Sequence, residues 1–193
     1  MTKQEQLKEL NGQMLKCSRC VLRGTCTQVV PGEGSAEAEI MFIGEGPGKK
    51  EDESGQPFVG AAGKFLAEML ASIKLKRENV YIANVVKCRP PENRDPLPLE
   101  AETCWPWLEA QVKIIDPKII VTLGRHSMER FLPGQKISEA HGKALRREIQ
   151  GLGKRVFFTL YHPAAALYNG SLRATLLKDF KKLPEVLELT KKH

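Results

Sequence analysis

The sequence predicts an α/β fold, in which a mostly parallel sheet is covered by helices on both faces. Short, continuously apolar runs alternate along the chain with segments whose apolar residues recur at helical spacing. This alternation is typical of parallel strands, because each parallel pair needs a long crossover connection, usually a helix. A chain of 193 residues is also long enough to bury a full core as one domain. We therefore expect a single domain over 1–193, with a helix and a cysteine knuckle in residues 1–35.

The first half of the chain predicts two helices and two strands. Apolar residues at helical spacing indicate a helix over 3–15, which leads into a cysteine pair and a loop rich in proline and glycine. A buried strand is predicted over 40–43 and ends at a glycine-rich segment. After a long loop, residues 61–73 have the single apolar face of a helix. The next apolar run, 80–86, predicts the second strand.

The second half begins with a basic loop, 87–98, whose four prolines exclude regular hydrogen-bonded structure. Further elements are then predicted in this order: a helix from about Leu99 to Ile115, a strand over 118–123, a helix over 125–131, a strand over 156–160 and a basic amphipathic helix from about Leu172. Ligands of parallel sheets bind beyond the carboxyl ends of the strands. Four such ends carry Gly44 and Glu45, Asn84, Gly124 and His162, so we expect these residues to converge on one site.

The charge balance favours a polyanionic partner. Thirty Lys and Arg against 23 Asp and Glu give a formal charge of +7 and a pI near 9.2. The apolar runs are too short to span a bilayer, and the first residues have no apolar signal region. We expect a cytoplasmic protein that does not bind membranes. Thiols are normally reduced in that compartment, which disfavours a disulfide framework.

Four of the five cysteines form a split pattern that predicts a metal centre. Cys17 and Cys20 are a close pair, and Cys88 and Cys104 follow far downstream. Four thiolates can hold either a tetrahedral zinc ion or an iron-sulfur cluster. The alternative is a set of scattered buried thiols, but the close pair lies in a polar, basic stretch where buried cysteines are not expected. Cys26 is left over and is expected to be an ordinary thiol.

The glycine-rich segment 44–48 does not match a phosphate-binding motif. A dinucleotide fingerprint that starts at Gly44 requires glycine where Lys49 stands, and Gly48-Lys49 and Gly63-Lys64 are followed by Lys50 and Phe65 where a phosphate loop requires Ser or Thr. What remains is a backbone that can approach a flat ligand closely, with Glu45 presented at the end of a strand. An ordinary turn is the alternative.

Three further residues have the chemistry of a base-binding pocket. Phe58 lies between glycines in a loop, where its ring can stack on a planar ligand or close the edge of the core. Asn84 is the polar residue of an apolar strand, and its amide can read the edge of a nucleobase or cap the strand end. His162 directly follows the last strand. It can stabilise charge on a leaving group or be structural.

Together these motifs resemble the family 4 uracil-DNA glycosylases, the iron-sulfur class. The resemblance runs from Cys17 to about Phe180 and rests on Gly44-Glu45-Gly46-Pro47-Gly48, Gly55-Gln56-Pro57-Phe58-Val59-Gly60, Asn84-Val85-Val86-Lys87-Cys88-Arg89-Pro90-Pro91 and His162-Pro163-Ala164. It implies a three-layer α/β/α sandwich around a short, mostly parallel central sheet. It also implies that Cys17, Cys20, Cys88 and Cys104 hold a structural [4Fe-4S] cluster.

The resemblance further implies hydrolysis of the N-glycosidic bond of uracil in DNA, with the base flipped out of the stack. Phe58 would then stack on the uracil, and Asn84 would hydrogen-bond its Watson-Crick edge. His162 would stabilise the departing base, and Glu45 would position or activate the water. Backbone around Gly44, Glu45 and Gly46 would complete the pocket.

Contacts with DNA outside the pocket are predicted more broadly. The candidates are Lys49, Arg89, Arg94, Arg125 and, as a wedge, Leu167. The expected partner is uracil-containing DNA, single- or double-stranded, bound by a monomer. Two alternatives remain at this point: a non-catalytic, metal-containing nucleic-acid-binding module of the same fold, and a hydrolase of small nucleosides.

Overall fold

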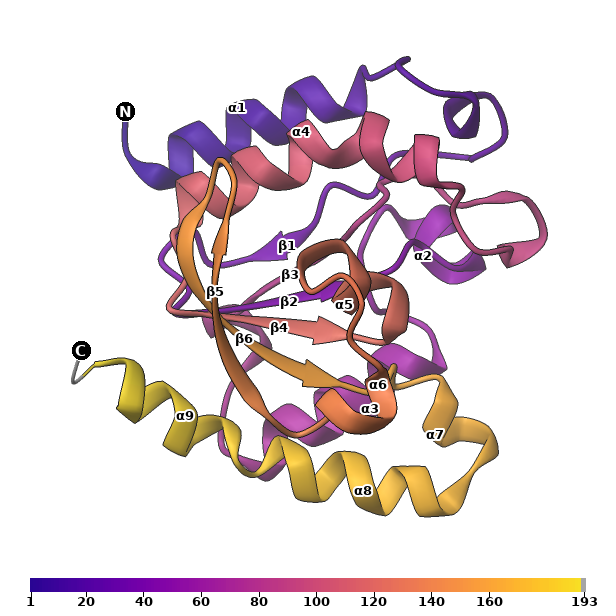
Figure 1. The fold of residues 1–193 in the computed structure, drawn as a ribbon. Helices are drawn as coiled ribbons and strands as arrows, with labels where there is room; N and C mark the ends of the chain where they lie inside the picture. Colours follow the sequence, from indigo (N-terminus) through magenta and orange to yellow (C-terminus); the bar gives the residue numbers. More distant parts are fainter. Residues whose placement is uncertain (192–193) are drawn as a thin grey trace.

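The computed structural model describes residues 1–191, so the last two residues of the predicted domain lie outside the described part. One six-stranded sheet lies between two layers of helices (Figure 1). The strands are β1 (Glu33–Gly34), β2 (Ile40–Gly44), β3 (Tyr81–Asn84), β4 (Ile119–Leu123), β5 (Ala144–Ile149) and β6 (Gly153–Leu160). The α-helices are α1 (Lys3–Leu15), α2 (Lys49–Ser54), α3 (Ala61–Ser72), α4 (Pro98–Ile115), α5 (Arg125–Phe131), α6 (Ile137–Ala140), α7 (Ala165–Tyr168), α8 (Gly170–Phe180) and α9 (Leu183–Thr190). Short 3-10 turns are η1 (Val21–Gly24), η2 (Arg77–Asn79) and η3 (Pro91–Asn93).

The sheet has the order β1-β3-β2-β4-β6-β5. The four central strands are parallel, whereas β1 and β5 run antiparallel at the two edges. All residues of β2, β3 and β4 are buried, which explains why these strands read as continuous apolar runs. This confirms the predicted α/β class with a mostly parallel sheet.

Side chains of one strand alternate between the two faces of the sheet, and each face has its own apolar core. In β2, Met41 and Ile43 pack with residues of α1 and α4, whereas Ile40 and Phe42 pack with residues of α3 and α8. Figure 1 shows α1 and α4 above the sheet and α3, α8 and α9 below it. The arrangement is the three-layer sandwich that the resemblance implied.

Several element boundaries differ from those predicted. The edge strands β1 and β5 were not predicted, because β1 has two residues and β5 exposes Arg146, Arg147 and Glu148. The predicted strand over 80–86 ends at Asn84, and the loop after the glycine-rich segment contains α2. The single C-terminal helix is two helices, α8 and α9, and Pro184 occupies the first turn of α9, where its missing N–H costs no hydrogen bond.

Within residues 1–191, no helix is both long enough and apolar enough to cross a membrane. The parallel strands point the same way, so β2, β3, β4 and β6 deliver their carboxyl ends to one edge of the sheet. That edge carries the candidate site.

Candidate active site at the carboxyl ends of the strands

A cavity of about 320 Å³ opens beside the ends of β2, β3 and β6. It is lined by Glu45, Gly46, Pro47, Gly48, Glu51, Phe58, Ala62, Asn84, Pro90, Asn93, Arg94, His162 and Ala164. The structure therefore brings together Glu45, Gly46, Phe58, Asn84 and His162, as the sequence predicted. Gly44 lies directly behind them. A Cβ on Gly44 would come within 2.7 Å of the Phe58 ring, so only glycine leaves room for that ring.

Asn84 ends β3 with a buried side chain that is 1% exposed. Among the described residues, its Oδ1 atom has no hydrogen-bond partner. A buried amide oxygen without a partner is costly, which makes such an atom at a cavity wall a candidate for ligand recognition. Asn84 is therefore ready to accept a hydrogen bond from a group that enters the cavity.

Phe58 is 7% exposed and borders the same cavity. Its ring centroid lies 5.7 Å from that of His162, with 32° between the two ring planes. The backbone of Phe58 has a φ of +52°, a left-handed conformation that bulky residues rarely adopt. The ring of Phe58 packs against the core and also forms a wall of the cavity.

His162 follows β6, and its Nδ1 atom accepts a hydrogen bond from the backbone N–H of Ala164 at 3.1 Å. Because Nδ1 is an acceptor, the ring proton of the neutral form is on Nε2. Burial lowers the pKa of His162 to about 4. The residue is thus a neutral hydrogen-bond donor at physiological pH.

Glu45 lies just beyond β2 in a cluster of charged groups. Its Oε2 atom is 3.7 Å from Nε2 of His126, and that nitrogen is 3.0 Å from Oδ2 of Asp95. Arg125 donates to the same Asp95 oxygen at 3.0 Å. Burial raises the pKa of Glu45 above its usual value, His126 opposes the rise, and Asp95 adds to it. No local sequence pattern indicates this cluster, because its members come from the residue after β2, the proline-rich loop and α5.

The predicted DNA-contacting residues differ in how free they are to bind phosphate. Arg94 donates two hydrogen bonds, at 2.8 and 2.6 Å, to the buried carboxylate of Glu100. Arg125 is paired with Asp95, and Arg89 donates to Asn93 at 2.7 Å. Lys49 is more accessible, with a 71% exposed side chain at 4.0 Å from Glu53. Leu167 is 40% exposed on α7, next to Tyr168, which is 92% exposed.

The four predicted cysteine ligands line one small cavity. Cys17, Cys20, Cys88 and Cys104 meet there from the N-terminal segment, the loop after β3 and helix α4. Two N–H groups point at the sulfurs: Trp107 Nε1 lies 3.3 Å from Cys17 Sγ, and the backbone N of Lys87 lies 3.3 Å from Cys104 Sγ. Such N–H donors stabilise thiolates at metal centres.

Cys26 is closer to this group than the sequence suggested. Burial raises the pKa of Cys88, and a thiol hydrogen bond between Cys26 and Cys88 adds to this rise. The Cys26 sulfur also lies 3.8 Å from Arg23. However, Cys26 is not among the residues that line the cavity of the other four cysteines.

An unpartnered amide, an aromatic ring and a neutral imidazole around one cavity at the strand ends are typical of enzymes that bind a nucleobase. A family model described as the uracil DNA glycosylase superfamily matches residues 31–188 of this chain. The chain is 48% identical over 188 residues to a type-4 uracil-DNA glycosylase of Archaeoglobus fulgidus, with 94% of each chain covered.

Two further relatives have the same description. The type-4 uracil-DNA glycosylase of Sulfurisphaera tokodaii is 46% identical over 200 residues, which cover 98% of this chain and 88% of the relative. That of Thermotoga maritima is 43% identical over 183 residues, with 94% of each chain covered. The chain therefore belongs to the type-4 uracil-DNA glycosylases, as the sequence motifs predicted.

Proposed function

We propose that the cavity binds a flipped uracil and that its excision depends on separate roles of Asn84, Phe58, His162 and Glu45. As a member of its family, the chain is a hydrolase of N-glycosyl bonds that removes uracil from DNA and leaves an abasic site. The observation that carries the proposed roles is the buried Oδ1 atom of Asn84, which lacks a partner among the described residues and borders the cavity.

Uracil presents an N–H donor and a carbonyl acceptor side by side on its Watson-Crick edge. The Asn84 amide offers an acceptor and a donor in the same plane, so one side chain satisfies both groups. Phe58 lies beside this amide and provides a flat surface for the pyrimidine ring. Stacking on such a surface is worth roughly 1–3 kcal/mol per base.

Breaking the N-glycosidic bond leaves the electron pair on the uracil ring, so negative charge develops on the base while the sugar becomes oxocarbenium-like. In our proposal the Nε2–H group of His162 donates a hydrogen bond to the departing base. A neutral imidazole suits this role, because it stabilises the developing charge while it keeps its proton. The Glu45 carboxylate faces the positive sugar and accepts a proton from the attacking water.

The four cysteines of the small cavity fit a [4Fe-4S] cluster better than a zinc ion. Sulfurs around a tetrahedral zinc lie about 3.8 Å apart, given Zn–S bonds of about 2.3 Å. In the described chain, no three of these cysteines have sulfurs that all lie within 4.8 Å of one another. A four-iron cluster holds each thiolate on a separate iron and suits the wider spacing.

We propose a structural role for the cluster, because hydrolysis transfers no electrons. It would tie the segment 1–35 to the rest of a single domain over 1–193. We further propose that the protein acts as a monomer in the cytoplasm, on uracil in single- or double-stranded DNA of the nucleoid.

Activity is tested by incubating the protein with a uracil-containing oligonucleotide and cleaving abasic sites with alkali. We expect strand cleavage, whereas an intact strand would favour the non-catalytic nucleic-acid-binding module. An assay with free deoxyuridine in place of DNA distinguishes a DNA glycosylase from a small-nucleoside hydrolase. We expect little release of uracil from free deoxyuridine. Asn84→Ala should lose most activity with an unchanged circular dichroism spectrum. Full turnover by this variant would refute the proposed base reading.

The cofactor is tested by colour and metal content. We expect a brown protein with broad visible absorption, and a colourless protein with stoichiometric zinc would contradict the cluster. Cys104→Ser should lose iron and absorption. Cys26→Ser is the matched control: it removes a neighbouring thiol outside the cavity, so iron and colour should remain.

A further inference from the structure

The turn that carries Phe58 holds this residue in an unfavourable backbone conformation. Left-handed φ angles are uncommon for bulky residues and persist only where the surroundings enforce them. Phe58 has a φ of +52°. Its neighbours must therefore supply the contacts that keep the ring at the cavity wall.

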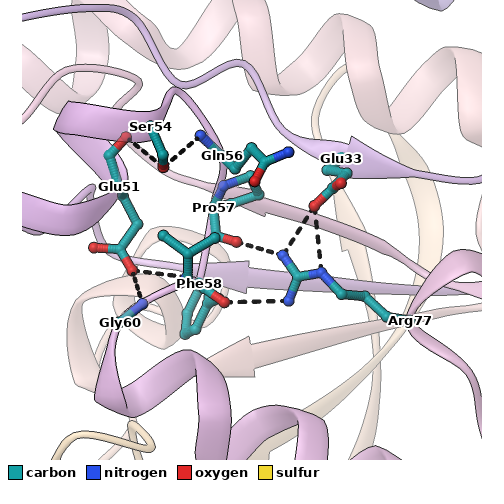
Figure 2. Close-up of polar contacts among 9 residues, drawn as sticks. Glu33, Glu51, Ser54, Gln56, Pro57, Phe58, Gly60 and Arg77 are labelled. Atoms are coloured by element: carbon teal, nitrogen blue, oxygen red, sulfur yellow. Dashed lines mark hydrogen bonds and ion pairs between the residues drawn. The ribbon is translucent and has the colours of Figure 1, made fainter.

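Arg77 of η2 binds this turn from one side (Figure 2). Its guanidinium donates to the carbonyl of Phe58 at 3.2 Å and also to the carbonyl of Pro57. The same group is paired with Glu33 of β1 at 3.0 Å. A planar fork of donors can bond two successive carbonyls and a carboxylate at once, which a lysine cannot do.

Glu51 of α2 holds the other side of the turn. One of its carboxylate oxygens accepts hydrogen bonds from the backbone N–H groups of Val59 and Gly60, each at 2.9 Å. Figure 2 shows Arg77 and Glu51 on opposite sides of Phe58. The positive guanidinium of Arg77 thus fixes two successive carbonyls of the turn, and the negative carboxylate of Glu51 fixes the two N–H groups that follow.

The helix that follows leaves little room for the turn to relax. A Cβ at Gly63 in the first turn of α3 would overlap the Phe58 carbonyl, so the backbone at Phe58 lies directly against this helix. The turn is constrained from three directions.

From these contacts we infer that Arg77 is a positioning residue for base recognition, which fixes the Phe58 ring in its stacking position by holding the two carbonyls of the strained turn. This rests on the proposed stacking role of Phe58. Arg77 is not among the residues that line the base cavity, and its side chain is 30% exposed behind the turn. It acts on the base only through Phe58. Without it, the turn relaxes toward an extended conformation and the ring leaves the cavity wall.

A purely structural role is the competing explanation, because Arg77 also connects η2 to β1 through Glu33. The two explanations differ in how the effects of substitutions combine. If Arg77 acts through the Phe58 ring, its loss has no further effect on catalysis once the ring is gone. If it only stabilises the fold, the two losses multiply.

The experiment is a double-mutant cycle of Phe58→Ala and Arg77→Met, with kcat and KM measured on a uracil-containing oligonucleotide. We expect Phe58→Ala to lower kcat/KM roughly tenfold to hundredfold, since it removes the stacking surface. Arg77→Met should lower kcat/KM roughly tenfold, mainly through a higher KM, because a misplaced ring weakens binding of substrate and transition state alike. The double variant should match Phe58→Ala within about twofold. Multiplied losses would overturn the inference.

Arg155→Met is the matched control. Arg155 is a half-buried arginine paired with Asp116 at 2.7 Å, outside the residues that line the base cavity, so its loss tests stability without touching the Phe58 turn. We expect Arg155→Met to change kcat/KM by the same factor whether residue 58 is Phe or Ala.

If Arg77→Met does not fold, Glu33→Gln is the substitute, because it weakens the ion pair that orients Arg77. It should again raise KM only when Phe58 is present. An unchanged kcat/KM for Phe58→Ala would instead refute the stacking role itself.

Discussion

His162 has a folded-state pKa far below its usual value, and this makes the stability of the protein depend on pH. Burial lowers the pKa from 6.5 to about 4, so the unfolded chain binds more protons than the folded one between these values. The stability due to neutral His162 is complete above pH 6.5 and is lost as the pH falls toward 4.

His162→Asn should flatten this part of the stability curve. Asparagine keeps an acceptor for the Ala164 N–H but does not titrate. Between pH 7 and pH 4 we expect the wild type to lose on the order of 1–3 kcal/mol more unfolding free energy than the variant. Urea titrations at both pH values measure the difference. Equal losses would show that the imidazole is not held neutral by the fold.

Glu45 is expected to set the acid limb of the activity profile, because it accepts a proton only when ionised. Burial raises the pKa of Glu45, and two of its charged neighbours, Asp95 and His126, act on that pKa in opposite directions. Asp95→Asn removes a repulsive charge and should move the limb to lower pH. His126→Ala removes an attractive charge and should move it to higher pH. Profiles of kcat/KM against pH check both shifts. A shift in the same direction for both variants would exclude this electrostatic control.

Glu45, Asn84 and His162 were found from the sequence because each stands where an apolar strand stops, whereas Phe58 was found from its place between glycines in a loop. The residues that hold them were not found. Arg77, Glu51 and His126 act across the fold, on groups contributed by other elements, and no local spacing indicates such pairs. Assigned roles for the found residues stay predictions until their variants are measured.

At the scale of single elements, two helical glycines have opposite consequences. Gly63 in α3 lies against the Phe58 carbonyl, whereas a Cβ on Gly12 in α1 would meet nothing within 4 Å. Gly12→Ala should therefore stabilise the protein by roughly 0.5–1 kcal/mol, because alanine restricts the unfolded chain and favours the helix. Gly63→Ala should lower both stability and activity, because the Phe58 turn must shift. Thermal melts and kcat/KM measure the pair. Normal activity in Gly63→Ala would mean that the turn can move without consequence.

The unit formed by β3 and its loop connects the cysteine centre to the base pocket. Lys87 is fully buried, and its ammonium donates to the Asn84 carbonyl at 3.0 Å and to Gln111 of α4 at 2.6 Å. Its backbone N–H points at Cys104. A cluster bound to Cys88 and Cys104 would thus fix the backbone that carries the Asn84 amide.

The longer helices were predictable at this scale because each buries one face, and the central strands because both of their faces are buried, which gives continuous apolar runs. The edge strand β5 was not, since Arg146, Arg147 and Glu148 face solvent and interrupt any apolar pattern. Its position is set by pairing with β6, a tertiary contact.

At the scale of the whole molecule, the net charge of +7 draws the protein to DNA without directing it to a base. The position of the base cavity is set by the parallel sheet, whose strands carry the cavity residues at one edge. Of the basic residues near that edge, Arg94 is tied to buried Glu100, and the Arg94 guanidinium holds the pKa of that carboxyl below its usual value. Lys49 is exposed, and its Nζ atom lies 4.0 Å from a Glu53 carboxylate oxygen.

This difference predicts distinct salt dependences for two variants. Each cation that contacts a DNA phosphate contributes about 0.7–0.9 to the slope of log affinity against log salt. Lys49→Gln should therefore weaken DNA binding and reduce that slope by about one contact. Arg94→Met should leave the slope unchanged and instead lower the melting temperature, because it removes the guanidinium partner of the buried Glu100 carboxylate. Binding of an undamaged duplex, measured at several salt concentrations, separates the two effects. A reduced slope in Arg94→Met would show that DNA displaces Glu100 from Arg94. Arg94 would then bind a DNA phosphate in the complex instead of staying paired with Glu100.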